Sequence, residues 1–165
     1  MFGRLRRNNK VRFIDPPEMI DGDLQLVLHQ TRPGDSRGWV PSYFFHMVHP
    51  GERQPMGYIS LRVGNTPHIV RYGGHIGYRV EPPFRGHHYA ARSCRLLLPL
   101  AAAHGLDPLW ITCNPENIAS RKSIERAGGV YVETVDVPAD TDIYQRGEFR
   151  KCRYRLDLPG DPSSV

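Results

Sequence analysis

Short stretches in which apolar residues occupy every second position recur along this chain, and each is typical of a strand with one buried face. Leu24, Leu26 and Leu28 form the first of them. The short apolar run at 109–113 indicates a strand of the more deeply buried kind. Turn residues separate these stretches. The predicted strands are 24–28, 43–48, 56–63, 76–80, 109–113, 130–137 and 149–158.

After residue 89 the spacing of apolar residues changes to that of a helix. Apolar residues from Ala90 to Ala101 fall on one helical face, and His104-Gly105 is a typical end signal. Pro99 lies inside this helix and should kink it or leave one backbone carbonyl without a partner. A second helix is predicted at about 118–127, with Asn117 near its cap.

The order of these elements, with the helices concentrated after the fourth strand, predicts a mixed α/β fold with a mainly antiparallel sheet and helices on both faces. A chain of 165 residues suffices for one core and is too short for two ordinary domains. We expect an irregular basic segment at 1–20, a single domain at 21–158 and a flexible tail at 159–165.

The charge pattern narrows the choice of partners. The formal net charge of +5 comes almost wholly from arginine, with 19 arginines against 3 lysines. A planar guanidinium can grip two phosphate oxygens at once, which suits phosphate-bearing ligands. Three widely spaced cysteines are typical of reduced thiols and give no metal-binding spacing. The cysteines therefore favour a cytoplasmic protein without a metal. No apolar stretch is long enough to span a bilayer or to form a signal peptide, so we expect a soluble protein.

The segment from Val80 to Ala90 carries the first candidate chemistry, because it joins a predicted strand to a predicted helix and contains Arg85-Gly86. A glycine lets backbone N–H groups approach a ligand closely. The helix that follows begins with unpaired N–H donors and the positive end of its dipole. Together these features predict a site for a diphosphate, with a simple tight turn as the alternative interpretation.

The wider sequence resembles two motifs of the GNAT superfamily of acyl-CoA-dependent N-acetyltransferases. The pattern Val-x-Pro-x-x-Arg-Gly-x-x-Tyr-Ala at 80–90 is similar to motif A of that family. Residues 117–120 and 125–129 are similar to its fourth-helix motif, and the detailed match covers about 74–131. The resemblance implies a GNAT-like fold and transfer of an acetyl group from acetyl-CoA to a primary amine, by direct attack in a ternary complex.

The resemblance also implies how acetyl-CoA is held. In this family the strands equivalent to 76–80 and 109–113 diverge, and the pantetheine arm of CoA enters between them. The backbone of Tyr78 and Val80 is implied to pair with that arm, with Asn117 and Ser120 on its far side. The residues implied to surround the diphosphate are Arg85, Gly86, His87, His88, Tyr89 and Ala90.

Three positions depart from the family pattern. His88 stands where the motif usually has glycine, so the backbone approach there is looser or the imidazole itself contacts phosphate. Ile124 replaces a tyrosine that often protonates the departing thiolate, and Thr112 replaces a glutamate base of the ribosomal-protein alanine acetyltransferases. These differences put the catalytic residues in doubt and leave the cofactor site intact.

An amine acceptor needs a group that takes its proton at neutral pH, and His75 is the best-placed candidate. The alternative is that His75 fills the sheet with its hydrogen bonds satisfied. Other candidates for the base or the acid are His46, His49, Glu52, Ser123, Tyr144 and Tyr154.

The acceptor groove is expected between the loops 31–41 and 138–147. Acidic side chains there would attract a cationic amine, and aromatic ones would cover it. The candidates are Asp35, Asp140, Asp142, Trp39 and Tyr43.

Two other functions stay open at this point. Because the usual tyrosine and glutamate are missing, the chain could be an acyl-CoA-binding module without turnover. The arginine-rich surface could instead bind nucleic acid, which would make binding depend on salt. We favour the acetyltransferase acting on an amine-bearing small molecule or peptide. The sequence leaves open whether it forms a homodimer.

Overall fold

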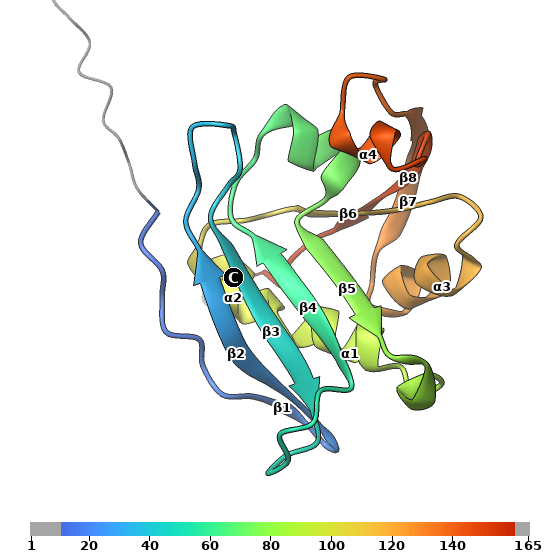
Figure 1. Cartoon of the computed structure of the whole chain (residues 1–165). Coiled ribbons are helices and arrows are strands. Elements are labelled where there is room, and N and C mark those ends of the chain that lie inside the picture. Colours follow the sequence, from blue (N-terminus) through green and yellow to red (C-terminus); the bar gives the residue numbers. More distant parts are fainter. Residues whose placement is uncertain (1–10, 161–165) are drawn as a thin grey trace, which may run out of the picture.

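The computed structural model describes residues 11–160, and they form two antiparallel sheets (Figure 1). The larger sheet has the order β1-β2-β3-β4-β5, and the smaller one has the order β6-β8-β7. Strands of the larger sheet are β1 (Met19–Asp21), β2 (Leu24–Arg32), β3 (Ser42–Val48), β4 (Gly57–Arg62) and β5 (Ile76–Val80). Those of the smaller sheet are β6 (Leu109–Cys113), β7 (Val130–Asp136) and β8 (Arg150–Leu156).

Six helical segments connect these strands. The α-helices are α1 (Tyr89–Leu96), α2 (Leu98–Ala103), α3 (Ile118–Arg126) and α4 (Asp142–Gln145). A single π-helical turn, η1 (Ile69–Gly73), precedes β5, and a 3₁₀ turn, η2 (Pro82–Phe84), follows it. Within residues 11–160, none of these helices has the length and apolar character needed to cross a bilayer.

The mixed α/β class and the antiparallel pairing are confirmed, and Pro99 has the expected effect on the first helix. That helix is interrupted at Leu97, and α2 begins with the proline in its first turn. Four elements were not predicted: β1 at the end of the segment expected to be irregular, η1, η2, and α4 within the expected loop. The N-terminal residues 1–10 and the tail 161–165 lie outside the described residues.

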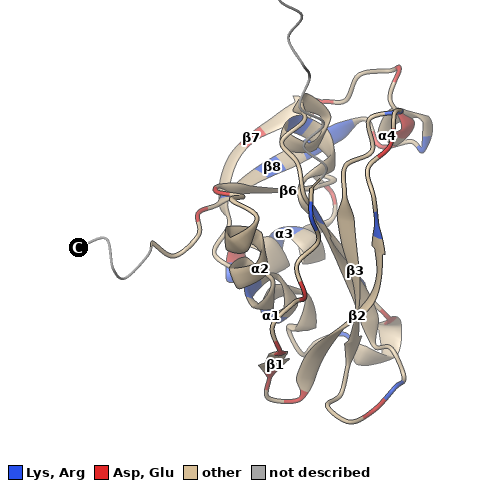
Figure 2. Ribbon diagram, turned by 90° about the vertical axis from the view of Figure 1, so that its left-hand side faces the viewer, with Lys and Arg blue, Asp and Glu red and all other residues tan. Residues whose placement is uncertain are grey.

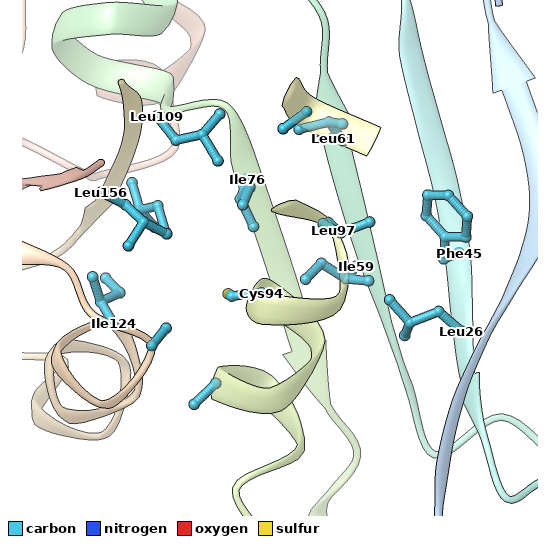
Figure 3. Close-up of a cluster of buried hydrophobic side chains, with 14 of the residues drawn as sticks. Leu26, Phe45, Ile59, Leu61, Ile76, Cys94, Leu97, Leu109, Ile124 and Leu156 are labelled. Carbon is cyan, nitrogen blue, oxygen red and sulfur yellow. The ribbon is translucent and has the colours of Figure 1, made fainter. Parts of the chain in front are cut away.

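One hydrophobic core lies behind both sheets. Figure 3 shows side chains from β2, β3, β4 and β5 meeting others from α1, β6, α3 and β8. Phe45, Leu97 and Leu109 are fully buried, and Ile124 of α3 is as well. The two sheets are therefore held together mainly by apolar packing, which needs no hydrogen bonds between their facing edges.

The two faces of the larger sheet differ. Helices α1 and α2 pack against one face, whereas Figure 2 shows no helix over β2 and β3 on the opposite face. The connection from β2 to β3 spans only 33–41 and forms no helix. Tyr58, at the middle of that open face, is 49% exposed. The polar side of β3, β4 and β5 is thereby left accessible next to the short segments η1 and α4.

Candidate active site

The edges of the two sheets meet at one point and then diverge. At the meeting point the His75 backbone N–H donates to the Trp110 carbonyl at 2.7 Å. Beyond it, β5 pairs only with β4 and β6 pairs only with β8 among the described strands. The space between β5 and β6 opens into a cleft of about 1020 Å³. This cleft reaches from α3 on one side to η1, α4 and the loop before β3 on the other.

The strand β5 presents free backbone groups to this cleft. Arg62 N–H donates to the His75 carbonyl at 2.7 Å, and Glu81 N–H donates to the Met56 carbonyl at 2.8 Å. In an antiparallel ladder alternate residues of a strand bond to the same neighbour. Odd-numbered residues of β5 therefore bond to β4, and the N–H groups of Tyr78 and Val80 point toward the gap. The Val80 carbonyl accepts from Arg85 Nε at 3.0 Å.

His75 closes the narrow end of the gap from inside the core. Its side chain is fully buried, and Nδ1 accepts a hydrogen bond from Trp110 N–H at 2.9 Å. Nε2 therefore carries the proton and donates to Asn65 Oδ1 at 2.8 Å. Burial lowers the pKa of His75 to about 4. Neither ring nitrogen is free to take a proton from an amine in this arrangement, which favours the alternative of a satisfied core histidine.

The loop before α1 has the exposed backbone that an anion site needs. Residues 85–88 are exposed, and Gly86 has a φ of +92° with open space where a side chain would lie. His88 also has a left-handed backbone, with a φ of 61°, and it caps α1 without a side-chain hydrogen bond. The first turn of α1 contains no acidic residue. The αL backbone explains why glycine is favoured at position 88 and why an exposed histidine can replace it at some cost.

The next two residues of the expected diphosphate loop are buried. Ala90 is 7% exposed, and Tyr89 directs its hydroxyl away from the loop to Asp23 Oδ2 at 2.5 Å. Arg92 joins the loop before α1 to the turn between β1 and β2, because its guanidinium bonds to the His87 carbonyl and to Asp21 and Asp23. Tyr89 can thus offer only its backbone N–H to a ligand, and the side chains around it fix the loop against β1 and β2.

The far wall of the cleft comes from α3. Asn117 caps this helix by accepting from Ser120 N–H at 3.1 Å, and both residues line the cleft. The Tyr78 hydroxyl crosses from β5 to this helix and bonds to Ser120 Oγ at 2.8 Å. Burial raises the pKa of Tyr78 well above its usual value. The structure therefore brings Tyr78, Asn117 and Ser120 together, while Val80 and the 85–90 loop lie outside the cleft lining.

Apart from Asp140 and Asp142, the other end of the cleft is built from charged side chains that sequence patterns did not single out. His68 Nε2 lies 3.9 Å from Asp142 Oδ1 of α4. Lys151 of β8 donates to Asn114 Oδ1 at 2.8 Å and forms an ion pair with Glu148. Desolvation by itself would raise the pKa of Glu148, but the bonds from Lys151 lower this pKa overall. Arg62 of β4 also lines this end of the cleft.

The residues expected to bind the acceptor divide into two groups. Trp39, Asp140 and Asp142 line the cleft. Tyr43 does not, because its ring is fully buried and its hydroxyl lies 2.6 Å from His104 Nε2 in the core. Asp35 also lies outside the lining and pairs with Arg37. The same holds for the other acid and base candidates: His46, His49, Glu52, Ser123, Tyr144 and Tyr154 do not line the cleft.

The family model for the acetyltransferase (GNAT) domain matches residues 4–130. The chain belongs to the GNAT acetyltransferase family. No curated protein matches it by sequence. Within residues 11–160 of this GNAT domain, no cluster of three metal-ligating side chains occurs.

Solved structures share this GNAT fold at low sequence identity. The acetyltransferase MccE, solved with acetyl-CoA and AMP, has a TM-score of 0.55 and 14% identity over 71% of this chain and 61% of its own. RimL, a ribosomal L7/L12 α-N-protein acetyltransferase solved with CoA, has a TM-score of 0.55 and 18% identity. The match covers 73% of this chain and 64% of RimL. The ribosomal-protein-S5-alanine acetyltransferase from Vibrio fischeri has a TM-score of 0.56 and 18% identity. The match covers 70% of this chain and 61% of that protein. The chain thus spans a little under two thirds of the length of these proteins.

Two positions at which this GNAT domain departs from the family pattern have structural roles here. Ile124, in place of the tyrosine, is fully buried in the core and packs against Gly129. Thr112, in place of the glutamate, lines the cleft and donates from Oγ1 to the Tyr72 carbonyl at 2.7 Å. His68, which lines the cleft immediately before η1, is the candidate base instead, and its position gave no signal in the sequence.

Proposed function

We propose that this chain is an N-acetyltransferase that moves an acetyl group from acetyl-CoA to a primary amine. One observation carries the proposal: a single cleft joins the free backbone edge of β5 to a separate group of charged side chains on η1, α4 and β8. Two substrates could enter it from opposite ends. Membership of the GNAT family supports the same activity.

In this proposal the cofactor lies along β5 and α1. The diphosphate binds at the N-terminal end of α1, where Arg85 adds positive charge and the exposed backbone of Gly86 can approach it. The pantetheine arm pairs with the N–H groups of Tyr78 and Val80. A backbone N–H on the same strand polarises the thioester carbonyl as negative charge develops on its oxygen.

The amine then attacks the thioester from the open face. A C–N bond forms, the C–S bond breaks, and one proton leaves the nitrogen while the CoA thiolate gains another. We assign the first proton to His68, because its imidazole lines the cleft and its Nε2 lies 3.9 Å from Asp142 Oδ1. The hydroxyls of Ser120 and Tyr78, on the cofactor side, are available to the thiolate. The cytoplasmic location expected from the cysteines stays a prediction.

Calorimetric titration with acetyl-CoA and with CoA tests the cofactor site, and a proline tests the role of β5. Because the Val80 N–H points into the gap, Val80→Pro removes a donor for pantetheine without removing a bond to β4. We expect Val80→Pro to weaken CoA binding by about tenfold, since a net hydrogen bond contributes about 1 kcal/mol and the ring also crowds the arm. Val80→Ala keeps the N–H and should bind like the wild type.

The outcomes separate the three functions. Tight binding together with acetylation of amines supports the proposal. Binding of acetyl-CoA with no transfer to any amine would indicate an acyl-CoA-binding module. Absence of binding to either cofactor, with salt-dependent binding of nucleic acid, would overturn the proposal in favour of a basic nucleic-acid-binding protein.

A further inference from the structure

Arg62 is an arginine at the cleft with no acidic partner. Its Nη1 donates to the carbonyls of Gly74 at 2.9 Å and of Gly73 at 3.3 Å. Among residues 11–160 no carboxylate forms an ion pair with it, and Nε and Nη2 have no hydrogen-bond partner. Nε and Nη2 are not fully buried, because the only fully buried polar side-chain atom without a partner in that range is Ser93 Oγ. The free donors of Arg62 therefore face the cleft.

The surroundings of Arg62 make an unpaired charge costly. Arg62 is half-buried, and desolvation lowers the pKa of its guanidinium, which stays charged at neutral pH. Arg146 of the same cleft adds repulsion, whereas Asp142, which provides some attraction, already pairs with Arg146 at 3.0 Å. A half-buried cation of this kind gains most from an anion that brings two oxygen atoms to its free edge.

The position of Arg62 sets how close that anion must be to the reacting amine. A side chain at Gly77 would lie only 3.3 Å from Arg62 Nη2, so the guanidinium sits directly above this residue of β5. Gly77 precedes Tyr78, whose N–H points into the gap. An anion held by Arg62 is thus only a short distance from the acetyl group in the proposed complex. A carboxylate separated from the amine by one or two carbon atoms fits this spacing.

We propose that the acceptor is a small amino acid whose carboxylate is bound by Nε and Nη2 of Arg62 while its amine faces the thioester. This assignment of the acceptor rests on the proposed acetyltransferase function and adds the class of substrate to it. The amine end points toward His68 and Asp142, and the aromatic rings of Trp39 and Tyr58 border the same part of the cleft. A protein N-terminus whose first residue is not aspartate has no carboxylate so close to its amine, so it would leave Arg62 unpaired.

Acetylation of free L-amino acids and of their carboxamides tests this assignment. The wild type should prefer the carboxylates by about tenfold or more in kcat/KM, the size expected for a charge-assisted contact. Arg62→Gln should reduce that preference to near unity, because the amide can still donate to the Gly74 carbonyl but carries no charge. Arg32→Gln is a matched control: Arg32 lies in the same row of the sheet, opposite Ser42, which is opposite Arg62, and it is exposed. This variant should keep the preference.

A binding measurement keeps this test separate from the proposed function. In the presence of CoA, N-acetylglycine should bind the wild type measurably more tightly than N-acetylglycinamide, and Arg62→Gln should abolish the difference. Equal use of carboxamides and carboxylates by an active enzyme would overturn the carboxylate assignment and leave the acetyltransferase in place. Binding of N-acetylglycine that depends on Arg62, without any acetyl transfer, would overturn the function and retain the carboxylate site.

Discussion

The two ends of the cleft are built in different ways. At the cofactor end the available groups are mainly backbone N–H donors of β5 and of the start of α1, which lie within one run of residues from 76 to 90. At the acceptor end they are side chains from β4, η1, α4 and β8, from Arg62 to Lys151. A backbone site depends on local conformation, so few residue types specify it. A side-chain site depends on which distant segments the fold brings together.

Under the proposed function, this difference would allow the acceptor to change while the cofactor stays the same. Replacement of His68, Arg62 or Asp142 alters the charge at the acceptor end without changing the edge of β5. Replacement of Gly86, or a change in the order of the strands, would instead affect the proposed cofactor site, whatever the acceptor. Variants at each end, and at His75 at the closed end of the gap, test whether the two ends are separate.

The largest expected effect concerns His75, at the closed end of the gap. Its pKa is about 4 in the folded protein, mainly because of burial, against an ordinary value near 6.5. Between these values the unfolded chain binds more protons, so the free energy of unfolding falls as the pH drops from 6.5 toward 4. The loss attributable to His75 is about 3 kcal/mol at pH 4. Urea unfolding at several pH values, with an NMR titration of the ring, measures it.

His75→Asn provides the comparison, because an amide oxygen can still accept from Trp110 N–H but does not titrate. Its stability should fall less steeply over the same pH range. His46 and His104, whose pKa values burial also lowers, contribute to both profiles and cancel in the difference. An NMR pKa near 6.5 for His75 would contradict a closed end buried in the core.

The second effect tests the acceptor end alone. We expect His68→Ala to lower kcat for amine acetylation by about a hundredfold, the lower range for a general base, and to leave the Kd of acetyl-CoA unchanged. His29→Ala is the control, because His29 stacks on His46 on the open sheet face outside the cleft. A loss of acetyl-CoA affinity in His68→Ala would mean that the two ends are not separate.

The smallest effect compares two neighbouring positions with left-handed backbone. His88→Gly should raise the free energy of unfolding by about 1 kcal/mol, because glycine adopts a φ of 61° without strain. Gly86→Val should lower it by a similar amount and weaken CoA binding, since a β-branched residue resists a φ of +92° and blocks the backbone. Thermal unfolding and calorimetry measure both. Equal CoA affinity in Gly86→Val and the wild type would exclude the loop as the diphosphate site.

Much of the fold was readable from the sequence because its signals are local. The alternation in β3 and β4 and the proline at 99 each act within a few residues, and the structure has the strands and the helix break there. The short strand β1 escaped because Met19–Asp21 has no pattern of its own and pairs only with β2. The segment η1 escaped because its contacts are with β6 and β8, distant in sequence.

The candidate site shows the same division. The residues proposed to bind the cofactor come from one contiguous motif together with the cap of α3, and Tyr78, Asn117 and Ser120 do line the same cleft. The acceptor residues Arg62 and His68 carried no such signal, because a lone arginine on a strand is usually a solvated charge. What distinguishes Arg62 is that it lies half-buried in the cleft without an ion pair among the described residues, and only the folded arrangement reveals that.

The hydrogen bond from Tyr78 to Ser120 has a consequence for how the cofactor is received. It ties β5 to α3 across the opening, and the shared core behind it holds the sheet edges at a fixed separation. The cleft is therefore preorganised, and acetyl-CoA would pay little conformational entropy to enter it. Amide hydrogen exchange along β5 and β6 should then slow through direct protection of the Tyr78 and Val80 N–H groups, with little change in the strands behind them.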